Sequence, residues 1–407
     1  MDRLHNTVRP YAWGSTTALP EFLGEEATGE PQAELWMGGH PLAPSRVDRG
    51  AGPAPLSDVI AADPAGELGD GPLDAFGPRL PFLLKVLGVH APLSLQVHPD
   101  ERQAREGFAR EEAEGVPLEA AHRNYKDAHH KPELVCALTP FEGLCGFRPA
   151  AEAAQLLAGL GVDALKPYVD LLYARPEEGA LREVLTAVLG ADREQMAATV
   201  HHTAEAAGEL AARGGEWAAD YDCYARIAQH HPGDPGLVAA MLLHHVVLAP
   251  GEALHLDAGV PHAYVSGLGL EIMANSDNVL RCGLTPKHVD VPELLRIVRF
   301  TPGEPGVLRP EANGGGEEVY QTPTREFRLS RFALAPGSAP VDLRREAPQI
   351  LLCGAGSVTL EGNGSRPGSE ERLPLRRGES VYVPAGERVA ARGDGTLFRA
   401  TVPVGGD

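Results

Sequence analysis

Short apolar runs bounded by glycine and proline make up most of the chain up to about residue 147. The run from Leu80 to Leu87 is an example, and runs of this kind predict strands joined by turns. Strand-like sequence returns from Leu242 to about Lys287, and a last such segment extends from about Tyr320 to Val402. These patterns predict a mainly β protein.

The sequence between residues 149 and 235 has a different pattern. It is rich in alanine and glutamate, and Pro149 suits the first turn of a helix. Five apolar residues recur there at the spacing of one helical face: Leu181, Val184, Leu185, Val188 and Leu189. We therefore predict a helical insert at residues 149–235, and a shorter helix from Val291 to Val298.

The composition is that of a globular protein, because 43% of the 407 residues are hydrophobic and 23% are charged. At ~150 residues per domain, this length predicts two or three domains. The 36 basic and 56 acidic residues give a net charge of -20. An acidic surface repels phosphate backbones, so we expect no binding of nucleic acid.

Other features of the composition bear on the cellular compartment. No apolar run reaches the ~20 residues that span a bilayer, and the first residues lack the apolar centre of a signal peptide, so we expect no membrane association. The five cysteines include no CxxC pair. This usage predicts reduced thiols in the cytoplasm, and it argues against disulfides and a thiolate zinc site.

The segment from Ser94 to Asp100 carries candidate metal ligands. On a strand, Gln96 and His98 project to one face, with Ser94 beside them, and Leu95 and Val97 project to the other. An amide oxygen and an imidazole nitrogen are both ligands for zinc-type metals. Taken alone, the same pattern also fits two polar residues on a half-exposed strand.

Three further segments carry polar residues in suggestive places. Pro132 favours an extended backbone, so Lys131 and Glu133 share a face, either at a site or as an ion pair in a loop. His262 follows a turn rich in Gly and Pro, where a solvated loop residue is the alternative. The segment from Glu271 to Lys287 holds a carboxylate, Arg281 and Lys287, and such cations recognise phosphate unless the segment is simply a charged loop.

Together these segments resemble the type I mannose-6-phosphate isomerases (phosphomannose isomerases), a family of zinc-dependent cupin enzymes. The resemblance extends from Tyr11 to Asp290, with its motifs in the expected order. The motifs are Y-A-W-G from Tyr11, E-L-W-M-G-G-H-P from Glu34, Q-V-H-P from Gln96, H-K-P-E from His130, P-H-A-Y from Pro261 and S-D-N-V-L-R-C-G-L-T-P-K from Ser276.

The resemblance implies a role for each matching residue. It implies one zinc ion per chain with four ligands: Gln96, His98, Glu133 and His262. It assigns Arg281 to catalysis, and it places five residues in the substrate pocket: Ser94, Lys131, Tyr264, Glu271 and Lys287. The implied substrate is a small sugar phosphate, and we expect a monomer.

The implied architecture is a cupin (jelly-roll) β-barrel, a helical domain and a second, metal-free cupin-like domain. Residues 1–148 and 236–319 would form the catalytic barrel, residues 149–235 the helical domain and residues 320–407 the C-terminal domain. A weak internal repeat agrees with this division, because a Gly-rich frame before His262 recurs before Val389. Val389 cannot bind a metal, so only the first barrel would hold one.

The reaction implied is interconversion of mannose 6-phosphate and fructose 6-phosphate through an enediol, which would supply the synthesis of GDP-mannose. The residues leave the proton-transferring base open among Glu271, Lys131, His40 and a metal-bound water. Arg281 has two possible roles, stabilising the enediolate or binding the phosphate.

Two rival functions are weaker. The nearest enzymatic rival is another metal-dependent sugar isomerase or a cupin oxygenase, and Gln96 and the cations count against an oxygenase, because oxygenases usually use a His-rich ligand set. A sugar-binding protein without catalysis would have lost a ligand or Arg281, and all five residues are present.

Overall fold

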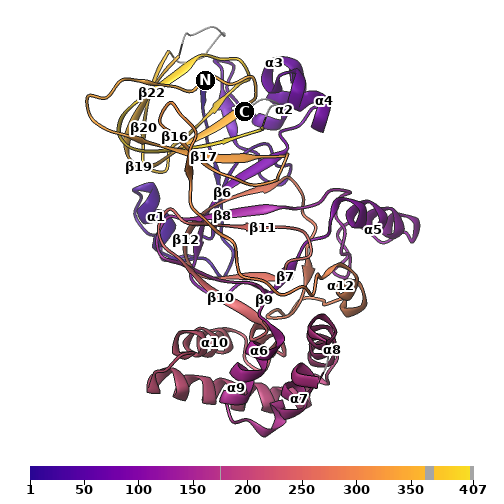
Figure 1. Cartoon of the computed structure of the whole chain (residues 1–407). Coiled ribbons are helices and arrows are strands. Elements are labelled where there is room, and N and C mark those ends of the chain that lie inside the picture. Colours follow the sequence, from indigo (N-terminus) through magenta and orange to yellow (C-terminus); the bar gives the residue numbers. More distant parts are fainter. Residues whose placement is uncertain (175, 363–370, 404–407) are drawn as a thin grey trace.

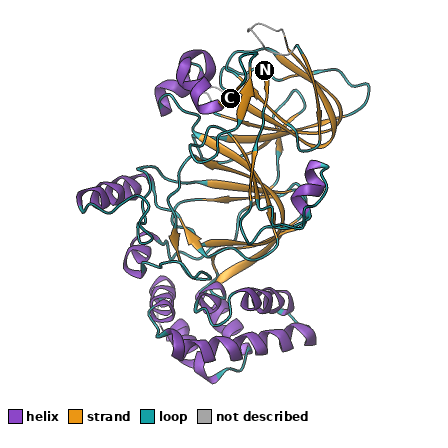
Figure 2. Cartoon of the chain, turned by 180° about the vertical axis from the view of Figure 1, so that it is seen from behind, coloured by secondary structure: helices purple, strands orange, loops and turns teal. Residues whose placement is uncertain are grey.

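The computed structural model describes residues 1–174, 176–362 and 371–403, which form three stacked parts (Figure 1). A β part at one end contains the N-terminus and the last strands of the described ranges, a second β part lies in the middle, and helices form the other end. Seen from behind, the remaining helices lie at the margins of the two β parts (Figure 2). The protein is therefore mainly sheet with one helical part, as the sequence predicts.

The middle part is one large antiparallel sheet, with eleven strands in the described ranges of the chain. Its longest strand, β12 (His262–Ala274), pairs with β6 (Phe82–Val89), β7 (Gln96–Val97), β8 (Glu133–Ala137) and β9 (Phe141–Phe147). The other strands are β2 (Thr7–Arg9), β3 (Glu34–Met37), β10 (Leu243–Leu248), β11 (Ala253–Leu256), β13 (Leu280–Arg281) and β14 (Val307–Leu308).

Every residue of β6 and β8 is buried, because both faces of the sheet are covered. We call the face that carries Lys85, Leu87 and Val89 the inner face; Leu87 and Val89 pack there with Tyr264. On the outer face, Leu84 packs with Leu134 and with residues of the C-terminal sheet. Burial on both faces explains why the strand sequences are continuous apolar runs rather than alternating ones.

The C-terminal sheet also contains strands from outside the last segment of the sequence. Its described strands are β1 (Asp2–Arg3), β15 (Glu311–Ala312), β16 (Glu317–Tyr320), β17 (Arg328–Leu334), β18 (Val341–Asp342), β19 (Gln349–Gly362), β20 (Arg372–Arg376), β21 (Ser380–Val383) and β22 (Val389–Thr401). The sheet thus begins at Glu311, before the expected boundary at residue 320, because β15 and β16 form a hairpin that pairs with β17. Residues 298–362 and 371–403 contain no helix. A separate pair, β4 (Arg46–Asp48) and β5 (Pro53–Pro55), lies near the N-terminus.

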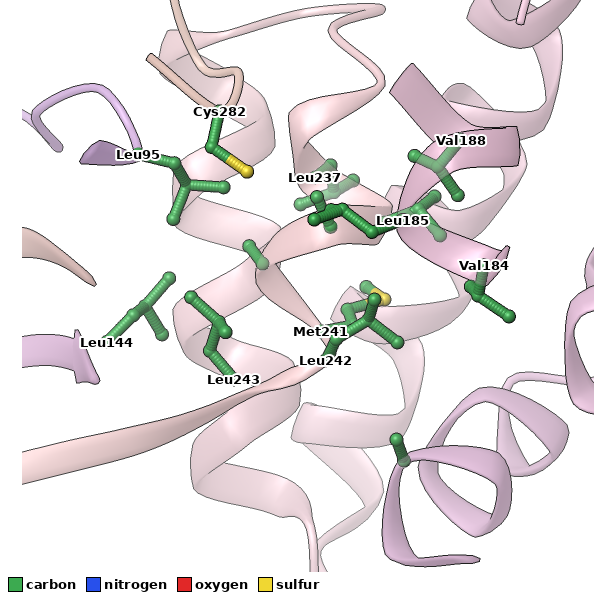
Figure 3. Packing of buried hydrophobic residues seen from close by; sticks show 14 of the residues in the cluster. Leu95, Leu144, Val184, Leu185, Val188, Leu237, Met241, Leu242, Leu243 and Cys282 are labelled. Atoms are coloured by element: carbon green, nitrogen blue, oxygen red, sulfur yellow. The ribbon is translucent and has the colours of Figure 1, made fainter. Parts of the chain in front are cut away.

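The helical part follows the predicted insert. Its helices are α6 (Ala150–Gly159), η1 (Asp163–Leu165), α7 (Lys166–Ala174), α8 (Glu177–Leu189), α9 (Arg193–Arg213), α10 (Ala218–His230) and α11 (Gly236–Ala240). Four of the five apolar residues on the predicted stripe of α8 are buried, and Leu189 is partly buried. The stripe packs against Leu237 and Met241, and the same core extends to Leu95 and Leu144 of the middle part (Figure 3).

The first 147 residues contain five helices that the pattern of apolar runs did not predict. They are α1 (Ala18–Leu23), α2 (Leu56–Ala62), α3 (Pro64–Leu68), α4 (Asp70–Phe76) and α5 (Glu101–Ala113). Four are at most seven residues long, so that any apolar periodicity covers no more than two turns, and α5 is highly charged. The helix predicted near residue 291 is present as α12 (Val291–Ile297).

None of the helices in the described ranges combines the length and the apolar character needed to cross a bilayer. The five cysteines are free and buried.

The core shared by the helical and middle parts predicts a large effect of truncating Leu185, which is 1% exposed. We expect Leu185→Ala to lower the free energy of unfolding by ~2–5 kcal/mol, because it removes buried apolar surface and leaves a cavity. The matched control is Thr186→Ala on the exposed side of the same helix, which should change it by less than ~0.5 kcal/mol. Urea unfolding of both variants measures the difference, and equal midpoints would contradict it.

Candidate metal centre

Three of the four predicted ligands meet at one end of the inner face. Glu133 is the first residue of β8, His262 is the first of β12, and His98 follows β7. Glu133 Oε2 lies 3.5 Å from His98 Nε2 and 3.4 Å from His262 Nε2. The three ligand atoms lie within 4.8 Å of one another, and all three residues are buried.

The two imidazoles are oriented as metal ligands. His98 Nδ1 lies 2.8 Å from the Asn278 carbonyl oxygen, and His262 Nδ1 lies 3.0 Å from that of Val260. A proton on each Nδ1 donates to these carbonyls, which leaves the Nε2 lone pairs directed toward Glu133. Second partners of this kind fix the tautomer of a metal-binding histidine.

The protonation state of His98 fits a metal ion. Burial lowers the pKa of His98 to about 4, although Glu133 opposes the shift. A neutral His98 Nε2 therefore carries a lone pair, and among the described residues it is a buried atom without a hydrogen bond. A lone pair and a carboxylate that face each other both require a cation between them.

Lys131 holds the other oxygen of Glu133. Its Nζ donates to Glu133 Oε1 at 3.0 Å. Burial alone would raise the pKa of Glu133, but Lys131 and the two imidazoles hold it well below its usual range. The carboxylate is thus ionised, with Oε1 bound to Lys131 and Oε2 facing the imidazoles.

Gln96, the fourth predicted ligand, is half-buried beside this group. It pairs with His262 across β7 and β12, and with Arg281 across β7 and β13. Directly paired residues project to the same face of a sheet, so the register places Gln96 between His262 and Arg281. Leu95 and Val97 belong to the core shared with the helices, as the alternation predicts.

The predicted substrate residues fall into two groups. The Tyr264 hydroxyl donates to Glu271 Oε1 at 2.9 Å, and both residues are buried near Lys131 and Glu133. Arg281 is half-buried and Lys287 is exposed. Burial and the neighbouring Arg281 lower the pKa of Lys287, so the two cations lie close together. Ser94 is half-buried, two residues before Gln96.

The sequence reasoning missed Lys85, which lies on the inner face of β6. Its Nζ donates to Glu271 Oε2 at 3.1 Å, lies 3.8 Å from Glu34 Oε2 and sits 5.2 Å from the centre of the Trp36 ring. Burial opposes its charge, yet Glu271, Glu34 and Glu133 raise the pKa of Lys85. The sequence did contain a signal for it, a single lysine inside an otherwise apolar strand. A lysine in such a buried strand is expected to have an acidic partner, because lysines are rarely buried unless they are paired.

His40 has an acidic partner that the sequence reasoning also missed. Its Nε2 lies 3.4 Å from Asp277 Oδ1. The neighbouring buried cluster holds the carboxylates of Glu34, Glu133 and Glu271 and the ammonium groups of Lys85 and Lys131. Its net charge is therefore -1, which a divalent cation would change to +1.

A second group, Glu142, Cys223 and His245, has similar spacing. Its carboxylate already accepts hydrogen bonds from Arg226, His245 and Ser266. Burial also raises the pKa of the Cys223 thiol, which opposes formation of a thiolate. These contacts satisfy the group without a metal.

Comparisons with known proteins point to one family. Residues 1–150 match the family model for the catalytic domain of type I phosphomannose isomerase. The mannose-6-phosphate isomerase of Escherichia coli K12 is 40% identical over 98% of this chain and 99% of its own. The chain belongs to the type I phosphomannose isomerase family. The human mannose-6-phosphate isomerase is 32% identical over 97% of this chain and 96% of its own.

Solved structures of this family have the same fold as the chain. A mutant phosphomannose isomerase from Salmonella typhimurium matches with a TM-score of 0.91 and 38% identity, covering 99% of this chain and 100% of that chain. The Salmonella mannose 6-phosphate isomerase bound to its substrate and to zinc matches with a TM-score of 0.89 and 38% identity, over the same shares. The family resemblance inferred from the sequence is confirmed.

The contact between Lys131 and Glu133 predicts an effect on metal affinity. We expect Lys131→Met to weaken binding of a divalent metal by ~10–100-fold, because the carboxylate loses the partner that orients it. Lys166→Met, which removes an exposed lysine at the start of α7, is the control. Competition with a metal-binding dye measures the affinity, and an unchanged affinity in Lys131→Met would show that Lys131 does not orient Glu133.

Proposed function

We propose that the chain interconverts D-mannose 6-phosphate and D-fructose 6-phosphate, with Zn²⁺ held by Gln96, His98, Glu133 and His262. The observation that carries the proposal is the position of Glu133 Oε2 beside two buried imidazole nitrogens whose other nitrogens face backbone carbonyls. The Salmonella enzyme bound to zinc and substrate supports the choice of metal and of substrate class.

When bound, zinc supplies a Lewis acid that polarises the sugar oxygens. The isomerisation moves a proton between C1 and C2 of the sugar. All three side-chain candidates for the base have partners: Lys131 binds Glu133, His40 faces Asp277, and Glu271 accepts from Lys85 and Tyr264. We favour Glu271 because burial raises its pKa above the usual range of a carboxyl group, which brings it closer to the pH at which a base works best.

Arg281 and Lys287 supply positive charge for the phosphate and for the developing enediolate. Burial lowers the pKa of Arg281, and Arg281 pairs with Gln96 across β13 and β7. We assign Ser94 and Tyr264 to substrate binding beside these cations. The assignment gives an acidic protein, with a net charge of -20, the local positive charge that a sugar phosphate requires.

The proposal extends to the architecture. A catalytic cupin barrel consists of residues 1–148 and 236–319, the helical domain of residues 149–235, and a metal-free cupin-like domain of residues 320–407, to whose sheet β1, β15 and β16 of the first two segments also pair. Supporting this, β12 and β22 each have 13 residues and begin with His262 and Val389, the two equivalent positions of the repeat. The chain acts as a cytoplasmic monomer whose product enters GDP-mannose synthesis.

A coupled isomerase assay tests the proposal. Protein stripped of metal with a chelator should lose activity on mannose 6-phosphate and regain it when zinc is added, with about one zinc per chain at saturation. Glu133→Gln, which keeps the size of the side chain but not its charge, should not regain activity at the same zinc concentration. Full activity in the chelator would exclude a metal-dependent reaction.

The position of Arg281 generates a separate prediction. We expect Arg281→Ala to lower kcat by at least ~10²-fold, because it removes charge from the transition state of a partly desolvated site. Arg309→Ala is the control, since Arg309 is 79% exposed and pairs with Glu252. If only KM changed, Arg281 would bind the phosphate equally well in the ground state and in the transition state. That result would exclude a catalytic role for Arg281.

A further inference from the structure

A cavity of about 640 Å³ lies away from the metal centre, on the outer face of the middle sheet. It is open on one side and is lined by the end of α4, the start of α5, the segment with His129, His130 and Pro132, the ends of β11 and β12, and residues 323–326. Helices α4 and α5 lie on the same side of the molecule in Figure 1. Six basic residues line it: Arg79, Arg105, His129, His130, His255 and Arg325.

The strand registers separate this cavity from the metal centre. His255 of β11 pairs with Leu134, which faces outward, whereas the next residue of β11, Leu256, pairs with Glu133. Pro132 lines the cavity, but Lys131 and Glu133 on either side of it face the metal centre. The two sites therefore lie on opposite faces of the same strands.

The carboxylates that line the cavity are already neutralised. Glu101 accepts from Arg105 at 2.6 Å, and Glu326 lies 2.8 Å from His130. Asp257 pairs at 2.8 Å with Arg299, which lies outside the lining.

Two of the cavity's three arginines have no such partner. Arg79 donates to the Phe76 carbonyl oxygen. Within residues 1–174, 176–362 and 371–403, neither Arg79 nor Arg325 forms an ion pair. Two guanidinium groups of the cavity are thus left without a carboxylate partner in a strongly acidic protein.

The wall around this charge is fixed in place. His255 Nε2 lies 3.0 Å from Thr324 Oγ1, and together with the pair between His130 and Glu326 this contact ties residues 323–326 to the middle sheet. Burial lowers the pKa of His129, and the positive charges of Arg79 and Arg105 lower it further, so both guanidinium groups lie near His129. A wall that is already ordered loses little entropy when a ligand binds.

We propose that this cavity is a second anion site that binds a phosphorylated small molecule. Guanidinium groups bind phosphate oxygens through paired hydrogen bonds, and the imidazoles supply further donors. The volume lies within the ~300–1,000 Å³ of small-molecule sites. The inference does not depend on the isomerase activity, because it concerns the opposite face of the sheet.

Isothermal titration of the full-length, zinc-loaded protein with inorganic phosphate tests the inference. The variant Arg79→Gln/Arg325→Gln should weaken one component of phosphate binding by at least about tenfold. Its kcat and KM for mannose 6-phosphate should stay at the wild-type values. The control Arg102→Gln/Arg309→Gln changes the net charge equally at two exposed arginines outside the cavity, and it should bind phosphate as the wild type does.

Two outcomes would overturn the inference. In the first, all phosphate binding disappears in Arg281→Gln and none in the cavity variant, so that the isomerase pocket is the sole site. In the second, the control weakens binding as much as the cavity variant, which would make the effect one of net charge. Arg325→Gln alone, at an exposed position, provides the same comparison if the double variant does not fold.

Discussion

The burial of the Glu133 carboxylate is the constraint on which the site depends. A buried ionised carboxylate is costly unless nearby groups compensate it, and removing one partner of a buried pair typically destabilises by ~3–5 kcal/mol. Lys131 compensates one oxygen of the carboxylate, and the two imidazoles that face the other oxygen come from two other stretches of the chain. Strands β7 and β8 must therefore both pair with β12 in the correct register before the charge can be buried.

Strand β12 meets this requirement because it is long enough to reach from the metal centre to the buried lysine of β6. Its first residue, His262, lies at the metal centre, and Glu271 lies further along, next to Lys85 of β6. The alternation around Gln96 and His98 turns Leu95 and Val97 into the helical core. The helical part thus stabilises β7 and the residue that follows it, which supply the proposed ligands Gln96 and His98, without contributing a ligand itself.

The sequence predicted the parts of this arrangement that local rules govern. Periodicity alone predicted three features: the apolar stripe around Leu185, the common face of Lys131 and Glu133, and the projection of Leu95 away from Gln96. The order of the motifs along the chain identified the family. The helix α5 lacks an apolar stripe, although its capping box at Asp100 and Gln103 was a readable signal. The pairing of Lys85 with Glu271 was beyond local rules, because 186 positions separate the two residues and only the sheet register joins them.

The pairing of β1 with β21 has a consequence for the order in which the protein is built. Asp2 and Arg3 are made before the strands of the middle sheet, but their partners, Tyr382 and Val381, are made after all of them. Domains generally fold as units during synthesis, beginning from the N-terminal side. Here β1 has no strand to pair with until β21 has been made. The C-terminal sheet can therefore take up β1 only after the ribosome has completed the middle sheet and the helical part that lie between them in the sequence.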